Sequence, residues 1–312
     1  MTAYVTLADG SIWRLPVLLA WEYERTDGCR CDWAKVEFLP ETRRKKELCM
    51  AKFLRLEHSG KTVFFGVVDE LRVTLDLQGH RAELVARGLM ALLTDSQLRQ
   101  KTCAVFGPQD AAKLAKDAGV ERVQAKGGTL QNFSWGTGAS VWSVIAGYCR
   151  HTGAKPRFLA DGTLVLSSAG GTWDLTDNCP VEAAEFRLLR CAAAAEAETV
   201  STGGQTEKAE SSAAKKLGIT TRKVASHRGK TLPASWRSAA QRLEDADREA
   251  VTAEVVLPGV CPAEPGDTVV LSLPQLLGGQ GRFHLRSLCV KMTEQGTQSL
   301  LELEGGLGSV AG

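Results

Sequence analysis

Short runs in which apolar and polar residues alternate recur near both ends of the chain. Gly266–Leu273 and Gly281–Leu288 are two such runs, and Ser299–Glu304 follows a Gly-Thr-Gln turn. Alternation with a period of two, in runs that stop at Gly or Pro, is typical of half-buried antiparallel strands. The pattern therefore predicts a sheet with one buried face at the C-terminal end.

The first 95 residues show the same alternation and predict a meander of strands. Asp9-Gly10 marks a hairpin turn between Tyr4–Leu7 and Ser11–Leu15, because Gly tolerates a positive φ. Further strands are expected at Trp33–Leu39, Lys52–Glu57, Thr62–Val68, Leu71–Leu77 and Arg81–Val85. Such a meander favours closure into a barrel or sandwich, which removes exposed strand edges.

The middle of the chain has a different pattern. Pro108–Ala118 predicts a short helix that stops at Gly119, and Ser140–His151 predicts an amphipathic helix with Gly153 in the capping position. A hairpin around the Asp161-Gly162 turn follows. These elements indicate a small α+β domain.

The strand pattern returns in the last part of the chain. Glu185–Cys191 and Ile219–Ser226 predict strands, whereas the polar stretch 192–216 fits either a strand pair with a long loop or partial disorder. The closing strands are expected at 251–257, 268–273, 282–292 and 299–304.

The clearest helix of the chain is expected over Pro233–Ala250. Its apolar residues recur at spacings of three and four, opposite charged residues. They are Leu232, Trp236, Ala239, Ala240, Leu243 and Ala246. We expect this helix to lie on a barrel and to cover a gap in it.

Together these patterns predict a mainly β protein with an α+β insertion. Its expected domains are a first β-barrel at residues 1–95, a small helix-plus-hairpin domain at 96–171 and a second β-barrel at 172–312. The second barrel carries the long helix near residues 233–250.

Composition narrows the class of partner. The 312 residues are 44% hydrophobic and 24% charged, and the net charge of +2 favours no polyanion, so no specific nucleic-acid binding is expected. The basic run within Pro40–Leu48 is expected to be a solvated loop. The chain has no apolar run long enough to span a bilayer and no signal-peptide pattern at its start, so we expect a cytoplasmic protein without membrane insertion.

The cysteines and histidines predict no metal site. Nine cysteines are an odd number, which favours reduced thiols over a disulfide framework. Cys29 and Cys31 form the only close pair, and no second pair or nearby histidine completes a zinc site. None of the five histidines falls in an H-x-x-x-H arrangement.

Three glycine-rich motifs resemble nucleotide-binding loops, but their contexts differ. Gly60-Lys61-Thr62 precedes a strand instead of a helix, so it is interpreted as a hairpin turn. Gly136-Thr137-Gly138 is interpreted as the start of a helix, capped by Thr137 or Ser140. Gly278–Gly281 is interpreted as a hairpin loop.

Catalytic pairs are also missing from the sequence pattern. Cys149 and His151 are two apart on a helix and point to different faces. Asp69 and Glu70 are adjacent on a strand, so their side chains face opposite ways. We therefore expect no enzyme, no catalytic residues and no cofactor or metal, and the partner-binding residues stay unassigned.

The order of these parts resembles the baseplate hub family of contractile phage tails and tail-like bacteriocins, also called the late control protein D family. Three passages carry the resemblance, namely Val63–Glu70 with Leu84–Asp95, then Ser143–Tyr148 with Phe158–Leu164, then helix 233–250 with Pro265–Val269 and Gly281–Leu303. The resemblance spans most of the chain, and residues 192–216 match least well.

The resemblance implies a structural function. Hub proteins of this family form trimers in which each subunit supplies two similar barrels, so that six barrels form a ring. Such a ring adapts the sixfold tail tube to the threefold spike. The implied partners are two further copies of the chain, the tail tube protein and the spike protein, with the tape-measure protein as a further candidate. The implied location is the baseplate of a phage or tailocin, assembled in the bacterial host cytoplasm.

Two other classes of function stay open from the residues. A β-rich cell-wall hydrolase of the tail needs carboxylates that meet only in the fold. A carbohydrate-binding or peptide-binding module would use a tryptophan as a stacking platform, although large aromatic residues more often fill cores. The candidates are Trp135, Trp142, Trp173 and Trp236.

Overall fold

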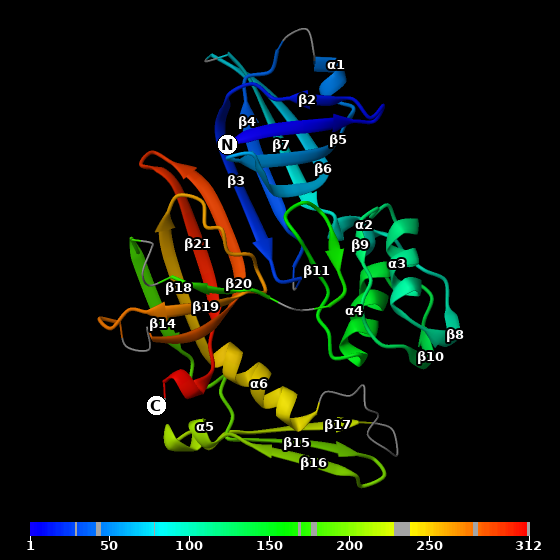
Figure 1. Ribbon diagram of the computed structural model, residues 1–312, viewed down its shortest axis with the longest axis vertical. Helices are drawn as coiled ribbons and strands as arrows, with labels where there is room; N and C mark the ends of the chain where they lie inside the picture. Colours follow the sequence, from blue (N-terminus) through cyan, green and yellow to red (C-terminus); the bar gives the residue numbers. More distant parts are fainter. Residues whose placement is uncertain are drawn as a thin grey trace. The chain divides into compact units, whose positions relative to one another are not determined.

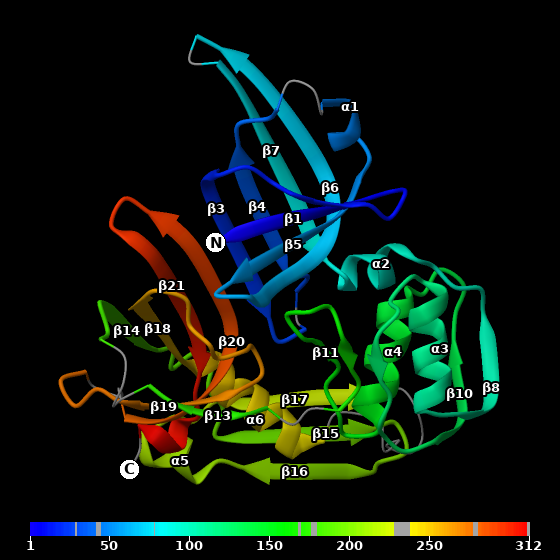
Figure 2. The ribbon, with the colours of Figure 1, turned by 45° about the horizontal axis from the view of Figure 1, so that its top comes forward.

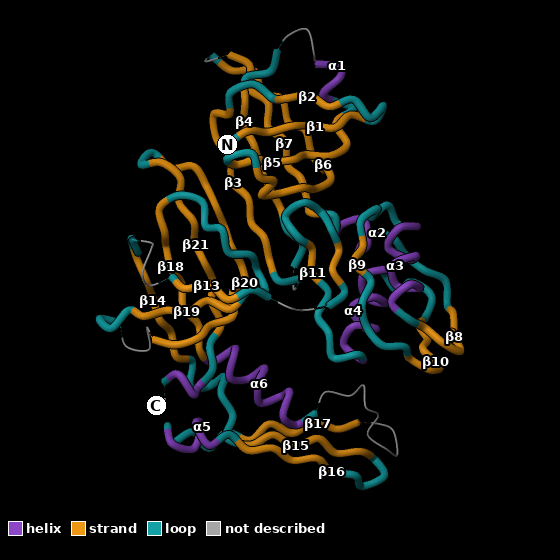
Figure 3. Tube along the Cα trace, in the orientation of Figure 1, coloured by secondary structure: helices purple, strands orange, loops and turns teal. Residues whose placement is uncertain are grey.

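The computed structural model describes residues 1–28, 30–41, 45–77, 79–167, 170–175, 180–227, 238–276 and 280–310. It is mainly β, which confirms the predicted class (Figures 1 and 3). The chain divides into two compact units. The first contains Met1–Ala169, Gly259–Gly266 and Ser287–Ser299, and the second contains Gly170–Pro258, Asp267–Arg286 and Leu300–Gly312.

The first unit contains an antiparallel sheet built mainly from N-terminal strands. Their order across the sheet is β3 (Leu18–Thr26), β4 (Trp33–Phe38), β7 (Gly79–Gly88), β6 (Lys61–Asp76), β5 (Ala51–His58), β1 (Thr2–Leu7) and β2 (Ile12–Arg14). The Ser287–Lys291 part of β20 (Gln280–Thr293) pairs with β3. Among the described strands this ladder is open, so the two predicted barrels stay a prediction.

Alternation gives this sheet its buried face. In β4 the residues Ala34, Val36 and Phe38 are at most 1% exposed, while the residues between them face outward. The predicted β1–β2 turn is also present. Gly10 adopts a φ of +85°, and the Ser11 N–H donates a hydrogen bond to Asp9 Oδ1 at 2.9 Å.

Two local predictions around this sheet need correction, and one strand was missed. The expected strands Thr62–Val68 and Leu71–Leu77 are one strand, β6, because its register with β7 shifts at Asp69 and forms a bulge. Lys45–Leu48 is a short helix, α1, within the expected loop. Strand β3 was not predicted at all.

The α+β region of the first unit has the predicted helices and hairpin. Its elements are α2 (Met90–Asp95), β8 (Lys101–Phe106), α3 (Pro108–Asp117), β9 (Val123–Gln124), β10 (Leu130–Trp135), α4 (Val141–His151), β11 (Arg157–Phe158) and β12 (Leu164–Val165). Strand β8 pairs with β10, and β12 pairs with β11 and β9. Ile145, Tyr148 and Cys149 of α4 are fully buried in the core that these elements share.

The second unit contains a sheet with C-terminal strands and a smaller layer beside a helix. Its elements are β13 (Thr172–Asp174), β14 (Ala183–Leu188), β15 (Glu196–Ser201), β16 (Thr206–Glu210), α5 (Ser212–Lys216), β17 (Arg222–His227), α6 (Ala239–Ala250), β18 (Val251–Pro258), β19 (Thr268–Ser272), β21 (Gly296–Glu304) and the 3-10 turn η2 (Leu307–Ser309). Strands β20 and β21 contribute residues to both units. No helix within the described ranges is long and apolar enough to cross a bilayer.

Strands β15 and β16 settle how the polar stretch 192–216 is built. It holds a strand pair, which was one of the two expected alternatives, but the connection at 202–205 is short instead of long. Strand β17 pairs with β15 in parallel and completes a three-stranded sheet.

Helix α6 packs on this three-stranded sheet. Its residues Ala239, Leu243 and Ala246 form a buried cluster with Ala194 and Ala197. The expected apolar stripe is thus partly correct, but Ala240 is exposed, and Leu232, Trp236 and the predicted start at 233 lie outside the described residues. The described helix begins after Ser238, whose Oγ accepts a hydrogen bond from the Gln241 N–H at 3.1 Å.

Candidate functional site

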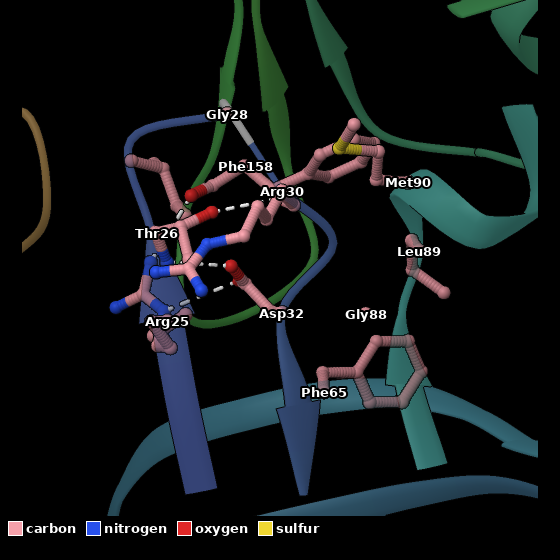
Figure 4. Close-up of a pocket in the computed structure, with 12 residues that line it drawn as sticks. Arg25, Thr26, Gly28, Arg30, Asp32, Phe65, Gly88, Leu89, Met90 and Phe158 are labelled. Atoms are coloured by element: carbon pink, nitrogen blue, oxygen red, sulfur yellow. Dashed lines mark hydrogen bonds and ion pairs between the residues drawn. The ribbon is translucent and has the colours of Figure 1, made fainter. Parts of the chain in front are cut away.

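One buried arginine, Arg25, connects three segments of the first unit, and Figure 4 shows its contacts with two of them. Its side chain is 5% exposed at the end of β3. The guanidinium donates a hydrogen bond from Nη2 to the Phe158 carbonyl at 3.0 Å, and it lies 3.6 Å from Asp32 Oδ2 and 3.5 Å from Glu264 Oε1. We call these four groups the ionic junction. It joins the β3–β4 turn, strand β11 and the segment 259–266.

The β3–β4 turn that carries Asp32 is held by its own hydrogen bonds. The Thr26 N–H donates to Asp32 Oδ1 at 2.8 Å, and Thr26 Oγ1 donates to the Arg30 carbonyl at 2.6 Å. Gly28 has a φ of +90°, and a Cβ at this position would lie 2.7 Å from the Pro156 carbonyl. The turn therefore presents Asp32 to Arg25 in one fixed geometry.

Burial dominates the electrostatics of the ionic junction. Removal from water raises the pKa of Asp32 to about 6, while the Arg25 charge and the Thr26 N–H act in the opposite direction. Asp32 is therefore ionised at neutral pH and takes up a proton near pH 6. At neutral pH the carboxylate faces a guanidinium that is also buried, so removal of either group leaves the other charge uncompensated.

The segment 259–266 is fixed at further points. Arg157 Nη1 donates a hydrogen bond to the Pro265 carbonyl at 2.9 Å. The Ser299 hydroxyl donates to the Gly259 carbonyl at 2.7 Å and accepts from the Cys261 N–H at 2.9 Å. Arginines from two different elements thus hold one loop against the first unit.

A small cavity lies beside the ionic junction, between the β3–β4 turn, Phe65, Leu89 and Phe158 (Figure 4). Its volume is about 10 Å³, which is space for about one water molecule. A substrate or cofactor does not fit there. The arrangement suits the positioning of three segments better than chemistry on a ligand.

The two described glycine motifs occupy the contexts that the sequence predicts. Gly60 lies in the β5–β6 hairpin turn with a φ of +76°. Gly136–Gly138 precedes α4, and Ser140 caps that helix by accepting a hydrogen bond from the Ser143 N–H at 3.1 Å. Of the third motif, Gly278 and Gly279 lie outside the described residues.

Cys149 and His151 face different surroundings on α4. The buried Cys149 thiol donates to the Leu166 carbonyl at 3.5 Å, and burial raises its pKa to about 12. The His151 ring packs edge-on against Phe133, with ring centres 5.8 Å apart. A thiol with so high a pKa is a poor nucleophile.

The carboxylates Asp69 and Glu70 each pair with an arginine. Asp69 forms an ion pair with Arg87, which also contacts Asp95, and Glu70 lies 2.9 Å from Arg72. Asp69 sits in the bulge of β6, where the register with β7 shifts, so the expectation that Asp69 and Glu70 face opposite ways stays a prediction.

The described tryptophans of the α+β region pack on its core. Trp135 and Trp142 are partly buried against this core. Trp135 Nε1 donates to the Arg99 carbonyl at 3.0 Å, and Trp142 stacks on Phe158 with ring centres 6.2 Å apart. These contacts favour the interpretation as core residues over a sugar-stacking platform. Trp173 is partly buried on β13, and Trp236 lies outside the described residues.

The cysteine pair considered for zinc is only half described, because Cys29 lies outside the described residues. The Cys31 thiol donates to the Gly88 carbonyl at 3.5 Å, and burial raises its pKa to about 12. Within the part of the chain that the structure describes, no group of three or more His, Cys, Asp and Glu side chains is placed to hold a metal ion.

Comparison by sequence finds no relatives, since no protein-family model and no curated protein matches the chain. Comparison by structure does. The tail protein from Neisseria meningitidis MC58 matches with a TM-score of 0.75 at 18% identity, over 99% of this chain and 98% of that one. The 43 kDa tail protein of prophage MuSo2 from Shewanella oneidensis matches with a TM-score of 0.74 at 14% identity, over 100% and 99%.

A component of the E. coli type VI secretion system matches as well, with a TM-score of 0.56 at 11% identity, over 92% of this chain and 73% of that one. That protein is itself described as structurally similar to the bacteriophage T4 tail proteins gp27 and gp5. The chain therefore has the fold of phage tail proteins. This confirms, at the level of the fold, the resemblance to tail baseplate proteins that the sequence predicts.

Proposed function

We propose that this chain is a structural subunit of a phage-type tail and acts at its baseplate. The observation that carries the proposal is the match to two tail proteins along almost the full length of both chains. Full coverage includes the N-terminal sheet, the α+β region and the C-terminal strands together. A match over one small module alone would support the proposal much less, since the same module occurs in proteins of many functions.

Within this class we propose the hub of a contractile tail, in a phage or a tailocin. Each subunit supplies two similar barrels, from residues 1–95 and 172–312, and residues 96–171 form the inserted domain. Three subunits then present six barrels, which match a sixfold tube on one side and a threefold spike on the other. Permanent interfaces of this kind bury roughly 2,000 Å² or more.

The partners in this proposal are two further copies of the chain, the tail tube protein, the spike protein and the tape-measure protein. The particle assembles in the host cytoplasm. The ionic junction supports a mechanical role, because Arg25 and Arg157 tie the segment 259–266 to two elements distant in sequence. A component that transmits force between tube and spike benefits from such internal ties.

Co-expression with the spike and tube proteins of the same particle tests the proposal. Native mass spectrometry should show three copies of this chain with one trimeric spike, and the chain and the spike purified singly are the controls. A chain that stays monomeric with both partners present contradicts the hub. A monomer that cleaves peptidoglycan supports the hydrolase, and tryptophan fluorescence quenched by a sugar supports the binding module.

A further inference from the structure

Helix α6 packs on the three-stranded sheet of β16, β15 and β17 (Figures 1 and 2). We call these four elements the α6 module. Within the described residues, Leu243 is the one large side chain in the buried cluster that joins helix and sheet. The other members are the alanines Ala194, Ala197, Ala239 and Ala246, with Ala209 partly buried against them. A buried alanine stabilises the fold little, because it removes little apolar area from water.

Two polar atoms are also buried in the α6 module. Thr199 shares a face of β15 with Ala197, which packs against α6. Thr199 is fully buried, and its Oγ1 makes no hydrogen bond to any described residue. Oδ1 of Asp247 on α6 is also buried without a hydrogen bond among the described residues, and burial, with the nearby Glu244 charge, raises the pKa of Asp247. Both groups have given up water without a replacement, which destabilises the closed module.

The ion pairs of the α6 module lie at its surface. Lys223 of β17 lies 3.8 Å from Glu249 of α6, and both side chains are exposed. Arg248 pairs with Glu244 within α6, so this pair does not tie the helix to the sheet. Exposed ion pairs contribute little stability because water screens the charges. These pairs therefore do not compensate for a core made mainly of alanine.

The other sheet of the second unit has a core of large side chains. Strand β18, which follows α6 directly, buries Val251, Val255 and Leu257, and β21 buries Leu301 and Leu303. All five are at most 1% exposed. Each of these side chains buries several times the apolar area of an alanine side chain, and stabilisation grows with that area. The α6 module is therefore the less stable part of the unit.

We propose that the α6 module opens as one cooperative element while the sheet of β18 and β21 stays folded. Regions with few large buried side chains open locally at a lower free energy than the core, and the elements that move in proteins are drawn from such regions. The inference goes beyond the proposed tail function, because it describes a movement within one subunit. A module that opens at low cost gives the subunit a part that rearranges without loss of the neighbouring sheet.

Native-state hydrogen exchange of the full chain, at urea concentrations below the unfolding transition, tests the opening. The amides of α6 and β15 should share one protection factor, at least about tenfold lower than that of the central amides of β18 and β21. Equal protection in the two groups overturns the inference, because exchange then requires unfolding of the whole unit. Protection that is low in α6 but high in β15 also overturns it, because the helix then opens alone.

Thr199→Val tests the physical cause in the same experiment. Valine has nearly the shape of threonine but no hydroxyl, so this variant should raise the protection of the α6 and β15 amides at least about fivefold and leave β18 unchanged. Thr206→Val is the matched control, because Thr206 is an exposed threonine on the neighbouring strand β16, and its effect should stay within about twofold. A Thr199→Val variant that exchanges like the control overturns the inference, because the buried hydroxyl then does not weaken the closed module.

Discussion

At the scale of single residues, the stability of the first unit depends on Arg25, because its charge is almost fully buried between Asp32 and Glu264. Arg25→Met keeps an unbranched apolar stem, although a shorter one, and leaves Asp32 buried without its cation. We expect this variant to lower the free energy of unfolding by about 3–5 kcal/mol. Urea unfolding followed by tryptophan fluorescence measures the loss.

Arg72→Met is the control for that experiment. Arg72 is 59% exposed and pairs with Glu70 and Glu83 at the surface, where an ion pair contributes less than about 1 kcal/mol. Equal losses from the two variants would show that burial of the ionic junction has no special energetic role.

The raised pKa of Asp32 predicts a pH dependence of stability. Because the folded pKa is about 6 and the ordinary value is 3.8, the folded state holds a proton that the unfolded state has released at intermediate pH. The stabilisation by this proton is fully present below roughly pH 4 and is lost as the pH rises through 6. The unfolding free energy of wild type minus that of Asp32→Asn should therefore fall between about pH 3 and about pH 7.5, a window that brackets both pKa values.

Urea titrations of both proteins at several pH values measure this difference. Since Asp32→Asn retains every other titrating group, the subtraction isolates Asp32. A difference that is flat would mean that the Arg25 charge offsets burial at this carboxylate, and one that grows with pH would mean that the charge outweighs burial.

The sequence pattern could not predict the ionic junction, and the reason is physical. Trp21, Tyr23 and Arg25 share the buried face of β3. A pattern of apolar residues places an arginine outside, because arginine is rarely buried unless it is paired. The paired carboxylate of Glu264 comes from a distant part of the chain, so only the folded protein shows why Arg25 faces inward.

At the scale of elements, Gly66 of β6 allows β6 and β7 to approach closely, because it has no Cβ. A Cβ at Gly66 would lie 2.2 Å from the Arg87 carbonyl oxygen and 2.8 Å from its carbon, which are backbone atoms and cannot rotate away. We expect Gly66→Ala to lower stability by about 1–3 kcal/mol. Gly136→Ala is the control, because nothing lies within 4 Å of its added Cβ, and its effect should stay within about 0.5 kcal/mol.

Thermal and urea unfolding of the two glycine variants give the comparison. If both variants unfold like the wild type, β6 and β7 can move apart at Gly66 without a loss of unfolding free energy. Gly66 also lies in the Val63–Glu70 passage that carries the resemblance to hub proteins, so this prediction gives that motif a physical reason.

Elements with strong periodicity were predictable, and elements built from small or polar residues were not. The alternation of β4 and the stripe of α4 bury large side chains, so their patterns are clear. The layer under α6 buries Ala194 and Ala197 instead, and Ala209 is partly buried against them. Each alanine buries little area, so the apolar pattern of residues 192–216 is weak. The sequence therefore left partial disorder open as an alternative there. The bulge at Asp69 likewise looked like a break between two strands.

At the scale of the whole molecule, the chain does not fold as a series of contiguous pieces. The first unit takes in Gly259–Gly266 and Ser287–Ser299 from late in the sequence. Periodicity reports only on neighbours along the chain and carries no information on such returns. The sequence-based boundaries at 95 and 171 therefore stay a prediction, while the structural match to tail proteins covers the whole chain.

This return of the chain makes the N-terminal sheet depend on a C-terminal strand. Val290 of β20 is fully buried opposite Tyr23 of β3. Val290→Asp places an unpaired charge there, and we expect a loss of more than about 3 kcal/mol with faster hydrogen exchange at the β3 amides. Met292 lies on the same strand but is 40% exposed, so Met292→Asp should leave the unfolding free energy and the exchange of the β3 amides nearly unchanged. Exchange that rises only within β20 itself would show that β3 and the other N-terminal strands are stable without their pairing to β20.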